Sequence, residues 1–216
     1  MSSKKLFALL FVAALGLAAV SRFAIADAAK EANAPASPAD LKLPPGWTME
    51  DMQACIVAGT PGKMQQHLVR EAGVWNGKTT MFMPGAEPQT SECVSTITPM
   101  MEGRFIKCEI KGEMPGMGPY DGLGLYGYDN TTKKFVSTWI DTQSTGMMQG
   151  TGELSEDGKV MTWKYTFSCP LTKKPAIMRE IETVTGENTK TLEMFCPDPK
   201  TGKEMKMMTI EFTKKT

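Results

Sequence analysis

Apolar and polar residues alternate from Trp75 to the C-terminus in short runs that are rich in Thr, Val, Ile, Tyr, Phe and Met. A period of two residues is typical of β-strands that bury one face. Turn-forming residues separate the runs at short intervals. The pattern predicts ten strands, near residues 76–83, 90–97, 104–112, 120–128, 134–142, 146–154, 159–168, 176–185, 189–196 and 204–214.

The connections between these strands are short and have the chemistry of tight turns. Pro84-Gly85, Asp129-Asn130 and Asp157-Gly158 are examples. Such turns reverse the chain within a few residues, so we expect consecutive strands to pair antiparallel. A flat sheet of this length would expose two edges and an apolar face, which favours closure into a barrel. The predicted fold class is therefore all-β, an up-and-down antiparallel β-barrel of about ten strands. A two-sheet sandwich is the alternative, but it usually needs a longer crossover connection.

Two short helices are predicted before the strands. Thr48 is a good N-cap residue, acidic residues follow it, and apolar residues recur at helical spacing until Gly59. A second helical stretch covers residues 63–71 and contains His67, the one histidine of the chain. A lone imidazole lacks the partners that metal binding or a catalytic triad requires. We therefore expect His67 to be a packed or half-exposed helix residue.

The N-terminus has the features of a secretory signal peptide. Lys4 and Lys5 precede an apolar run over residues 6–20, and Ala24-Ile25-Ala26 fits the small-x-small cleavage pattern. The run is shorter than the about 20 residues of a membrane span. We expect cleavage near Ala26 and export to the periplasm or the medium, with no membrane span in the mature chain. An uncleaved anchor is the alternative.

The rest of the chain predicts one domain behind a spacer. Residues 27–46 are rich in Ala and Pro with scattered charges, which indicates a flexible linker, and residues 47–216 form the predicted barrel domain. Acidic and basic residues balance in the full chain. Because no strongly basic surface is expected, the composition argues against a nucleic-acid or anionic-membrane partner.

Five cysteines occur in a chain expected in an oxidising compartment. The absence of a C-x-x-C motif excludes thioredoxin-type and zinc-ribbon sites, and we assign no metal site. If the hairpin reverses about residues 100 and 101, Cys93 and Cys108 lie opposite each other and can form a disulfide. The same register opposes Glu92 and Glu109, and a slip of two residues would relieve that repulsion but separate the thiols. Both registers stay open, and the other three cysteines are unassigned.

Gly122 to Gly127 matches the G-x-G-x-x-G spacing of a dinucleotide-binding loop. That loop requires a following helix whose N-terminus binds the phosphate. Here a turn and another strand follow, so we reject a nucleotide site.

The glycines have an explanation within an antiparallel hairpin. If Tyr128 faces Phe135 across the turn, Gly124 lies opposite Trp139, and Gly127 lies opposite Val136. Glycine opposite a bulky side chain lets a strand bend and lets the ring cover bare backbone.

Gly73-x-Trp75, after a short helix and before the first strand, resembles the signature of the calycin group, which includes the lipocalins. In that group the tryptophan closes one barrel end beneath a basic residue of the last strand. The last strand ends with Lys214 and Lys215 and has no arginine, so the resemblance implies this role for a lysine, although lysine cannot stack as arginine does.

Longer segments are similar to the bacterial domain-of-unknown-function family 1579, whose members are thought to be lipocalin-like barrels. The resemblance implies a fold and brings no catalytic residues. It is carried by residues 74–78, 84–88, 103–105, 124–130, 137–141 and 145–146.

Catalysis and metal binding are the alternatives to binding of a small molecule. Glu113 with Asp121, or Asp129 with Asp141, could act as paired carboxylates in a hydrolase-type enzyme, but no nucleophile and base pattern supports catalysis, and we assign no catalytic residue and no cofactor. The 18 methionines, together with the cysteines, could hold Cu(I). Methionine also fills irregular cores and adaptable pockets.

The sequence favours non-catalytic binding of a small, mostly apolar molecule inside the barrel. A barrel of about eight strands already has room for one small ligand. A carrier predicts a hollow interior, an enzyme predicts clustered carboxylates with shifted pKa values there, and an interaction protein predicts a solid interior with an apolar patch outside. The candidate ligand-binding residues, for which plain core packing is the alternative, are Trp75, Met81, Ile106, Ile110, Val136 and Ile140.

Overall fold

The computed structural model describes residues 43–198 and 200–216. The proposed signal peptide, residues 1–26, and most of the proposed linker lie outside this part of the chain. Met49–Thr216 form one compact unit that contains all helices and strands described below. Residues 43–48 belong to a separate unit, in which the amide of Trp47 donates to the carbonyl of Pro44 at 3.1 Å.

Both predicted helices are present. Helix α2 covers Met49–Gly59 and has no buried residue, and helix α3 covers Lys63–Arg70 and buries Gln65 and Leu68. Neither these nor any other helix in the described residues is long and apolar enough to span a bilayer. The Gln65 side chain donates to the carbonyl of Tyr128 at 2.9 Å, which holds α3 against one end of the strands.

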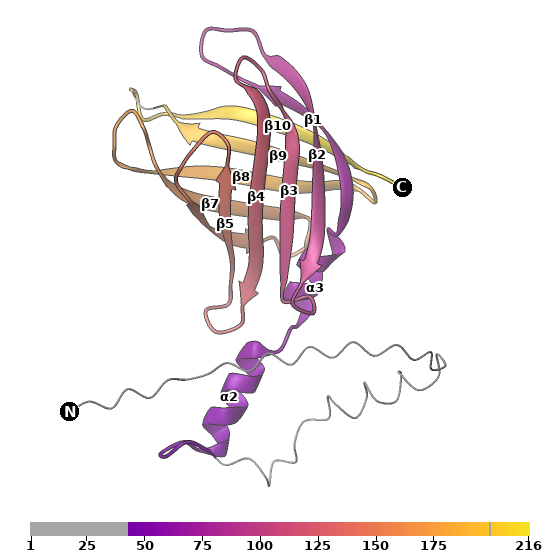
Figure 1. The fold of residues 1–216 in the computed structure, drawn as a ribbon, viewed down its shortest axis with the longest axis vertical. Helices are drawn as coiled ribbons and strands as arrows, with labels where there is room; N and C mark the ends of the chain where they lie inside the picture. The colour runs from indigo at the N-terminus through magenta and orange to yellow at the C-terminus, as the bar shows by residue number, and fades with distance from the viewer. Residues whose placement is uncertain (1–42, 199) are drawn as a thin grey trace, which may run out of the picture. The chain divides into compact units, whose positions relative to one another are not determined.

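Ten antiparallel strands follow and close into a barrel (Figure 1). Each strand pairs with its neighbours in the sequence, and β1 pairs with β10 to complete the ring. The prediction of an up-and-down barrel is confirmed. The strands are β1 Gly73–Met81, β2 Gln89–Met100, β3 Phe105–Met114, β4 Gly118–Asp129, β5 Lys134–Asp141, β6 Met148–Leu154, β7 Val160–Ser168, β8 Pro175–Gly186, β9 Thr189–Pro197 and β10 Glu204–Lys214.

The register between β4 and β5 is the one that the sequence predicted. Tyr128 pairs with Phe135, and Gly124 pairs with Trp139. A Cβ atom added to Gly124 would lie 2.7 Å from the Trp139 ring and 2.6 Å from the Tyr126 ring. Gly124 therefore makes room for aromatic side chains on the crowded inner face of the barrel, and strand β5, not a helix, follows β4.

The observed register between β2 and β3 differs from the registers that the sequence left open. Cys93 pairs with Gly112, and Cys108 pairs with Ile97. The reversal occurs later than predicted because Met101, Glu102 and Gly103 all have positive φ values and form the turn. This register also removes the repulsion between Glu92 and Glu109, since Glu109 instead pairs with Thr96 of β2.

Candidate functional site

The interior of the barrel contains a cavity of about 350 Å³. Residues from α3 and from all ten strands line it. Its size lies at the lower end of the range for small-molecule sites, which are mostly apolar with a few polar groups.

Apolar side chains form most of the cavity wall. Aliphatic residues such as Leu68, Ile97 and Ile210 contribute, together with aromatic rings and an unusual number of thioethers. Methionine is flexible and polarisable, so a wall of this kind can adapt to ligands of different shape. The methionines that line the cavity are Met81, Met114, Met148, Met161, Met178, Met194, Met207 and Met208.

The structure places three of the predicted ligand-binding residues in the cavity wall, namely Met81, Ile106 and Ile110. Trp75 is buried in the core but does not line the cavity. Val136 and Ile140 point outward, and they are 37% and 43% exposed. Their assignment to the interior is wrong.

The opposite face of β5 is the inner one. Phe135 and Ser137 are buried, and Trp139 lines the cavity. Alternating residues of a strand point to opposite faces, but both faces of β5 carry apolar residues. The alternation therefore could not show which face of β5 points into the barrel. Gly124 was the available signal, because its ring-covered position opposite Trp139 marks the crowded inner face.

Trp75 closes one end of the barrel, as the calycin resemblance implied. Its indole Nε1 donates to the carbonyl of Glu71 at 2.9 Å. The Nζ atom of Lys214 lies 5.2 Å from the centre of the Trp75 ring. The predicted lysine cover is present, and Lys190 adds a second ammonium group at 4.9 Å.

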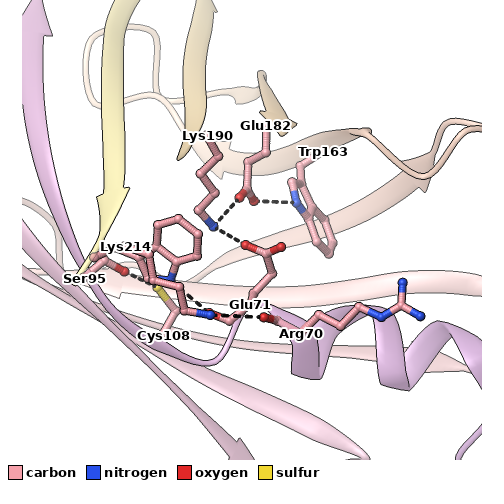
Figure 2. A network of polar contacts seen from close by, with 9 residues as sticks. Arg70, Glu71, Ser95, Cys108, Trp163, Glu182, Lys190 and Lys214 are labelled. Atoms are coloured by element: carbon pink, nitrogen blue, oxygen red, sulfur yellow. Dashed lines mark hydrogen bonds and ion pairs between the residues drawn. The ribbon is translucent and has the colours of Figure 1, made fainter. Parts of the chain in front are cut away.

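A buried ion cluster lies next to this end of the barrel (Figure 2). Lys190 Nζ contacts Glu71 at 2.8 Å and Glu182 at 3.2 Å, and Trp163 Nε1 donates to the other oxygen of Glu182 at 3.3 Å. Burial alone would lower the pKa of Lys190, but the two carboxylates outweigh it and raise this pKa above its usual value. Lys190 therefore stays charged.

Glu180 lies in the cavity wall without such a partner. Its side chain is buried, with the residue only 6% exposed. No hydrogen bond or ion pair joins its carboxyl group to any other described residue. Burial, and then the charge of Glu182, raise the pKa of Glu180 to about 8, although Lys190 opposes the shift. At neutral pH this carboxyl group is largely protonated.

Sequence reasoning missed this cluster, because Ile177 and Ile181 make the outer face of β8 as apolar as its inner face, and only β9 carried a signal. Glu180 and Glu182 alternate in phase with Met178 and Val184, and Lys190 is in phase with Leu192. A charged residue at the apolar phase of a strand points into the core, where it needs a partner or a function.

Two tyrosines add hydroxyl groups to the middle of the cavity wall. The hydroxyl groups of Tyr126 and Tyr165 lie 3.4 Å apart, and the Tyr126 ring packs edge-on against Trp163 at 5.3 Å. Burial raises the pKa of both tyrosines well above the usual value. Both hydroxyl groups are therefore neutral donors or acceptors.

A second polar group in the cavity wall is centred on Asp141. Trp139 Nε1 donates to Asp141 Oδ2 at 3.1 Å, and the Tyr120 hydroxyl lies 3.4 Å from the same oxygen. Burial, followed by the charge of Asp141, raises the pKa of Tyr120.

The predicted carboxylate pairs do not form. Glu113 lines the cavity, but Asp121 pairs with Lys111 at 3.5 Å among exposed side chains. Asp129 is a turn residue that accepts a hydrogen bond from the amide of Thr131 at 2.8 Å. One member of each predicted pair, Glu113 and Asp141, thus lines the cavity without its expected partner, and the cavity wall also contains Glu71, Glu180 and Glu182.

All five cysteines are free, so the Cys93–Cys108 disulfide is absent. The two thiols line the cavity, and each has a hydroxyl neighbour: Thr79 Oγ1 lies 3.6 Å from Cys93 Sγ, and Ser95 Oγ lies 3.4 Å from Cys108 Sγ. Burial raises the pKa of both thiols, that of Cys108 to about 11. They are protonated and poorly nucleophilic at neutral pH.

Among the described residues, no three or more His, Cys, Asp or Glu side chains are grouped to hold a metal ion. Methionine is not one of those four residue types. The eight methionines named above and the thiols of Cys93, Cys108 and Cys196 line the same cavity. The Cu(I) hypothesis stays a prediction. Absence of tight, stoichiometric Cu(I) binding to the reduced protein would refute it.

A closed antiparallel barrel with a tryptophan-sealed end and an interior cavity defines a lipocalin-like protein. The chain belongs to the family described as protein of unknown function DUF1579, whose model matches residues 60–214. The family resemblance seen in the sequence is thereby confirmed.

Two of the solved structures with a similar fold illustrate the likeness. Rv2717c from M. tuberculosis has 12% sequence identity and a TM-score of 0.55, and the match covers 73% of this chain and 100% of that one. The S-type phycobiliprotein lyase CPES from Guillardia theta has 10% identity and a TM-score of 0.51, with 75% and 97% covered. At this identity the similarity shows the fold alone. No curated protein sequence matches the chain.

Proposed function

We propose that this protein binds a small, mostly apolar molecule inside its barrel without catalysing a reaction on it. The observation that carries the proposal is the cavity of about 350 Å³ with a largely apolar wall. Burying apolar ligand surface there contributes about 25 cal/mol per Å². The lining polar groups would fix the orientation of the ligand. CPES, a lyase by name, has a similar barrel, which is consistent with small-molecule binding in this fold.

The direct test is native mass spectrometry of protein purified from its own host. We expect a co-purified small molecule that leaves when the protein unfolds. A ligand at a hundredfold excess over its Kd stabilises the folded state by about 2.7 kcal/mol. Reproducible absence of any bound molecule, with no thermal stabilisation by a panel of apolar compounds, would contradict the proposal.

A matched pair of variants tests where the molecule binds. Ile110→Trp adds volume to the cavity wall, whereas Ile140→Trp adds the same side chain on the outer face. Overpacking costs about 1–3 kcal/mol, which the inner variant is expected to show. We expect Ile110→Trp to lose ligand-dependent stabilisation and Ile140→Trp to keep it. Equal stabilisation of both variants would place the ligand elsewhere.

A second candidate function is general acid catalysis by Glu180. The raised pKa of this buried carboxyl group favours it, because a proton donor that titrates near neutral pH suits such chemistry. The hydrolase-type alternative therefore rests on Glu180 rather than on the carboxylates first considered. Long incubation separates the two functions: a carrier returns its ligand unchanged in mass, and an enzyme does not.

We also propose export of the protein with cleavage after Ala26. The support is the order of Lys4 and Lys5, the apolar run over residues 6–20 and the small residues at 24 and 26. Fractionation of the host followed by N-terminal sequencing tests this. We expect a mature form that begins at residue 27 outside the cytoplasm. A full-length cytoplasmic protein would contradict it.

A further inference from the structure

We propose that the ligand is an amphipathic amine whose ammonium group pairs with Glu180 while its apolar body fills the rest of the cavity. This inference rests on the proposed binding function and specifies its ligand class.

The first support is the unmatched state of Glu180. The next inward residue on the same strand, Glu182, binds Lys190 and Trp163, but the Glu180 carboxyl group binds none of the described residues. It is buried, and it lines the cavity. A buried carboxyl group without a partner is costly, so a partner of opposite charge in the cavity would complete the site.

The second support is the charge balance of the cavity wall. Five carboxyl-bearing residues line the described cavity, against two lysines and one histidine. Burial lowers the pKa of His67, so this histidine adds little positive charge at neutral pH. Lys190 is already committed to Glu71 and Glu182. The field inside the cavity therefore favours a cation and disfavours an anion.

The third support is the aromatic content of the wall. The rings of Tyr126, Trp163 and Tyr165 line the cavity and pack against one another. Ammonium groups are attracted to aromatic faces, and desolvation strengthens this attraction. A carboxyl group and several rings in one cavity suit an ammonium group better than they suit a neutral polar group.

An ammonium ligand should bind in a pH-dependent way because it requires ionised Glu180. Binding would release one proton, and below the pKa of the free site the affinity would rise about tenfold per pH unit. Tyrosine and cysteine neighbours stay protonated in this range, and Lys190 stays charged. The titratable groups coupled electrostatically to Glu180 are Tyr120, Tyr126, Tyr165, Cys108, Glu182 and Lys190.

Three probes with the same apolar body test the inference. They are 4-phenylbutylamine, 4-phenylbutan-1-ol and 4-phenylbutanoate, titrated calorimetrically into the full-length protein. We expect the amine to bind at least about tenfold more tightly than the alcohol, and the carboxylate to bind weakest. Amine and alcohol of equal affinity would overturn the inference but leave the proposed function standing. Binding of none of the three would contradict both.

Glu180→Gln and Glu113→Gln form the variant pair. The first removes the buried carboxyl group, and the second removes an exposed one that also lines the cavity. We expect Glu180→Gln to abolish the preference for the amine while retaining the alcohol, and Glu113→Gln to retain the preference. If both variants lose the preference for the amine equally, the preference comes from the summed charge of the cavity wall. That result would overturn the role of Glu180.

A measurement on the unaltered protein tests the same inference and does not depend on whether the variants fold. The amine is titrated from about pH 6 to about pH 8 in two buffers with different ionisation enthalpies. We expect the affinity for the amine to rise with pH, and the buffer to take up the proton that binding releases. The affinity for the alcohol should not depend on pH. An amine affinity that is flat over this range would overturn the inference.

Discussion

Two glutamates on strand β8 show how environment decides the state of a side chain. Glu182 has Lys190 and the Trp163 indole as partners, whereas Glu180 has a cavity in front of it. Burial, and then the charge of Glu182, therefore raise the pKa of Glu180 to about 8, and the opposing effect of Lys190 does not offset them. Glu182 is therefore part of a structural ion cluster, whereas Glu180, two positions before it, is a candidate ligand-binding group.

The raised pKa of Glu180 predicts a specific pH dependence of stability. The unfolded chain ionises this residue from its ordinary pKa of 4.5 upward, but the folded protein holds the proton until about pH 8. The unfolded state thus binds fewer protons in this window, so stability falls as pH rises through it. The slope contributed by one group is at most about 1.4 kcal/mol per pH unit.

Urea unfolding at pH values across this window measures the effect. Glu180→Gln should lose this component of the pH dependence, so that its stability relative to the parent increases with pH. A constant difference between the two proteins from about pH 5 to about pH 8 would contradict the buried, protonated state of Glu180.

Removal of Lys190 should destabilise the fold strongly. Lys190→Met leaves Glu71 and Glu182 without their shared cation in a partly desolvated site, and we expect a loss of about 3 kcal/mol. The matched control is Lys111→Met, which breaks an exposed ion pair with Asp121 and should cost less than about 1 kcal/mol. Chemical denaturation compares the two variants. Equal losses would show that the buried cluster is not structurally important.

At the scale of elements, short turns determined which registers were predictable. The β4–β5 hairpin turns at residues 129–133, and the sequence marked that turn with Asp129-Asn130. The β2–β3 hairpin turns through three consecutive residues of positive φ, two of which are Met101 and Glu102. Non-glycine residues rarely adopt that conformation, so the predicted centre of this turn was wrong.

Gly122 and Gly124 of β4 should resist substitution because aromatic rings cover them. In Gly124→Ala the new methyl group would meet the Trp139 ring at 2.7 Å, and overpacking of this kind costs about 1–3 kcal/mol. The control is Gly146→Ala, where the nearest atom beyond the neighbouring residues is Ser144 Oγ at 3.5 Å. Thermal unfolding should show a large decrease in Tm only for Gly124→Ala. A neutral Gly124→Ala would contradict the proposed crowding of the inner face.

At the scale of the whole barrel, closure depends on the pairing of the first strand with the last. Strand β10 pairs with β1 from Lys214 opposite Trp75 to Met208 opposite Met81. Deletion of residues 204–216 would expose the edges of β1 and β9 and open the cavity. Open edges promote association between chains.

We therefore expect the shortened protein to aggregate or to lose its cooperative unfolding transition. Deletion of Thr216 alone, which lies beyond β10, should leave both properties unchanged. Size-exclusion chromatography and circular dichroism provide the readout. A monomeric, cooperatively folded protein without β10 would show that closure is not needed for stability.

The sequence by itself determined the number, order and approximate bounds of the strands, the two helices before them and the lysine over Trp75. These features depend on local alternation, turn residues and short motifs, which the chain displays directly. Only the tertiary structure decided which face of β5 is inside, because alternation is symmetric with respect to the two faces. It alone assembled Glu71, Glu182 and Lys190 from α3's end, β8 and β9 and left Glu180 facing a cavity. The contact between Glu71 and Lys190 joins residues far apart in the chain, and the energies of all these contacts depend on burial that no local pattern specifies.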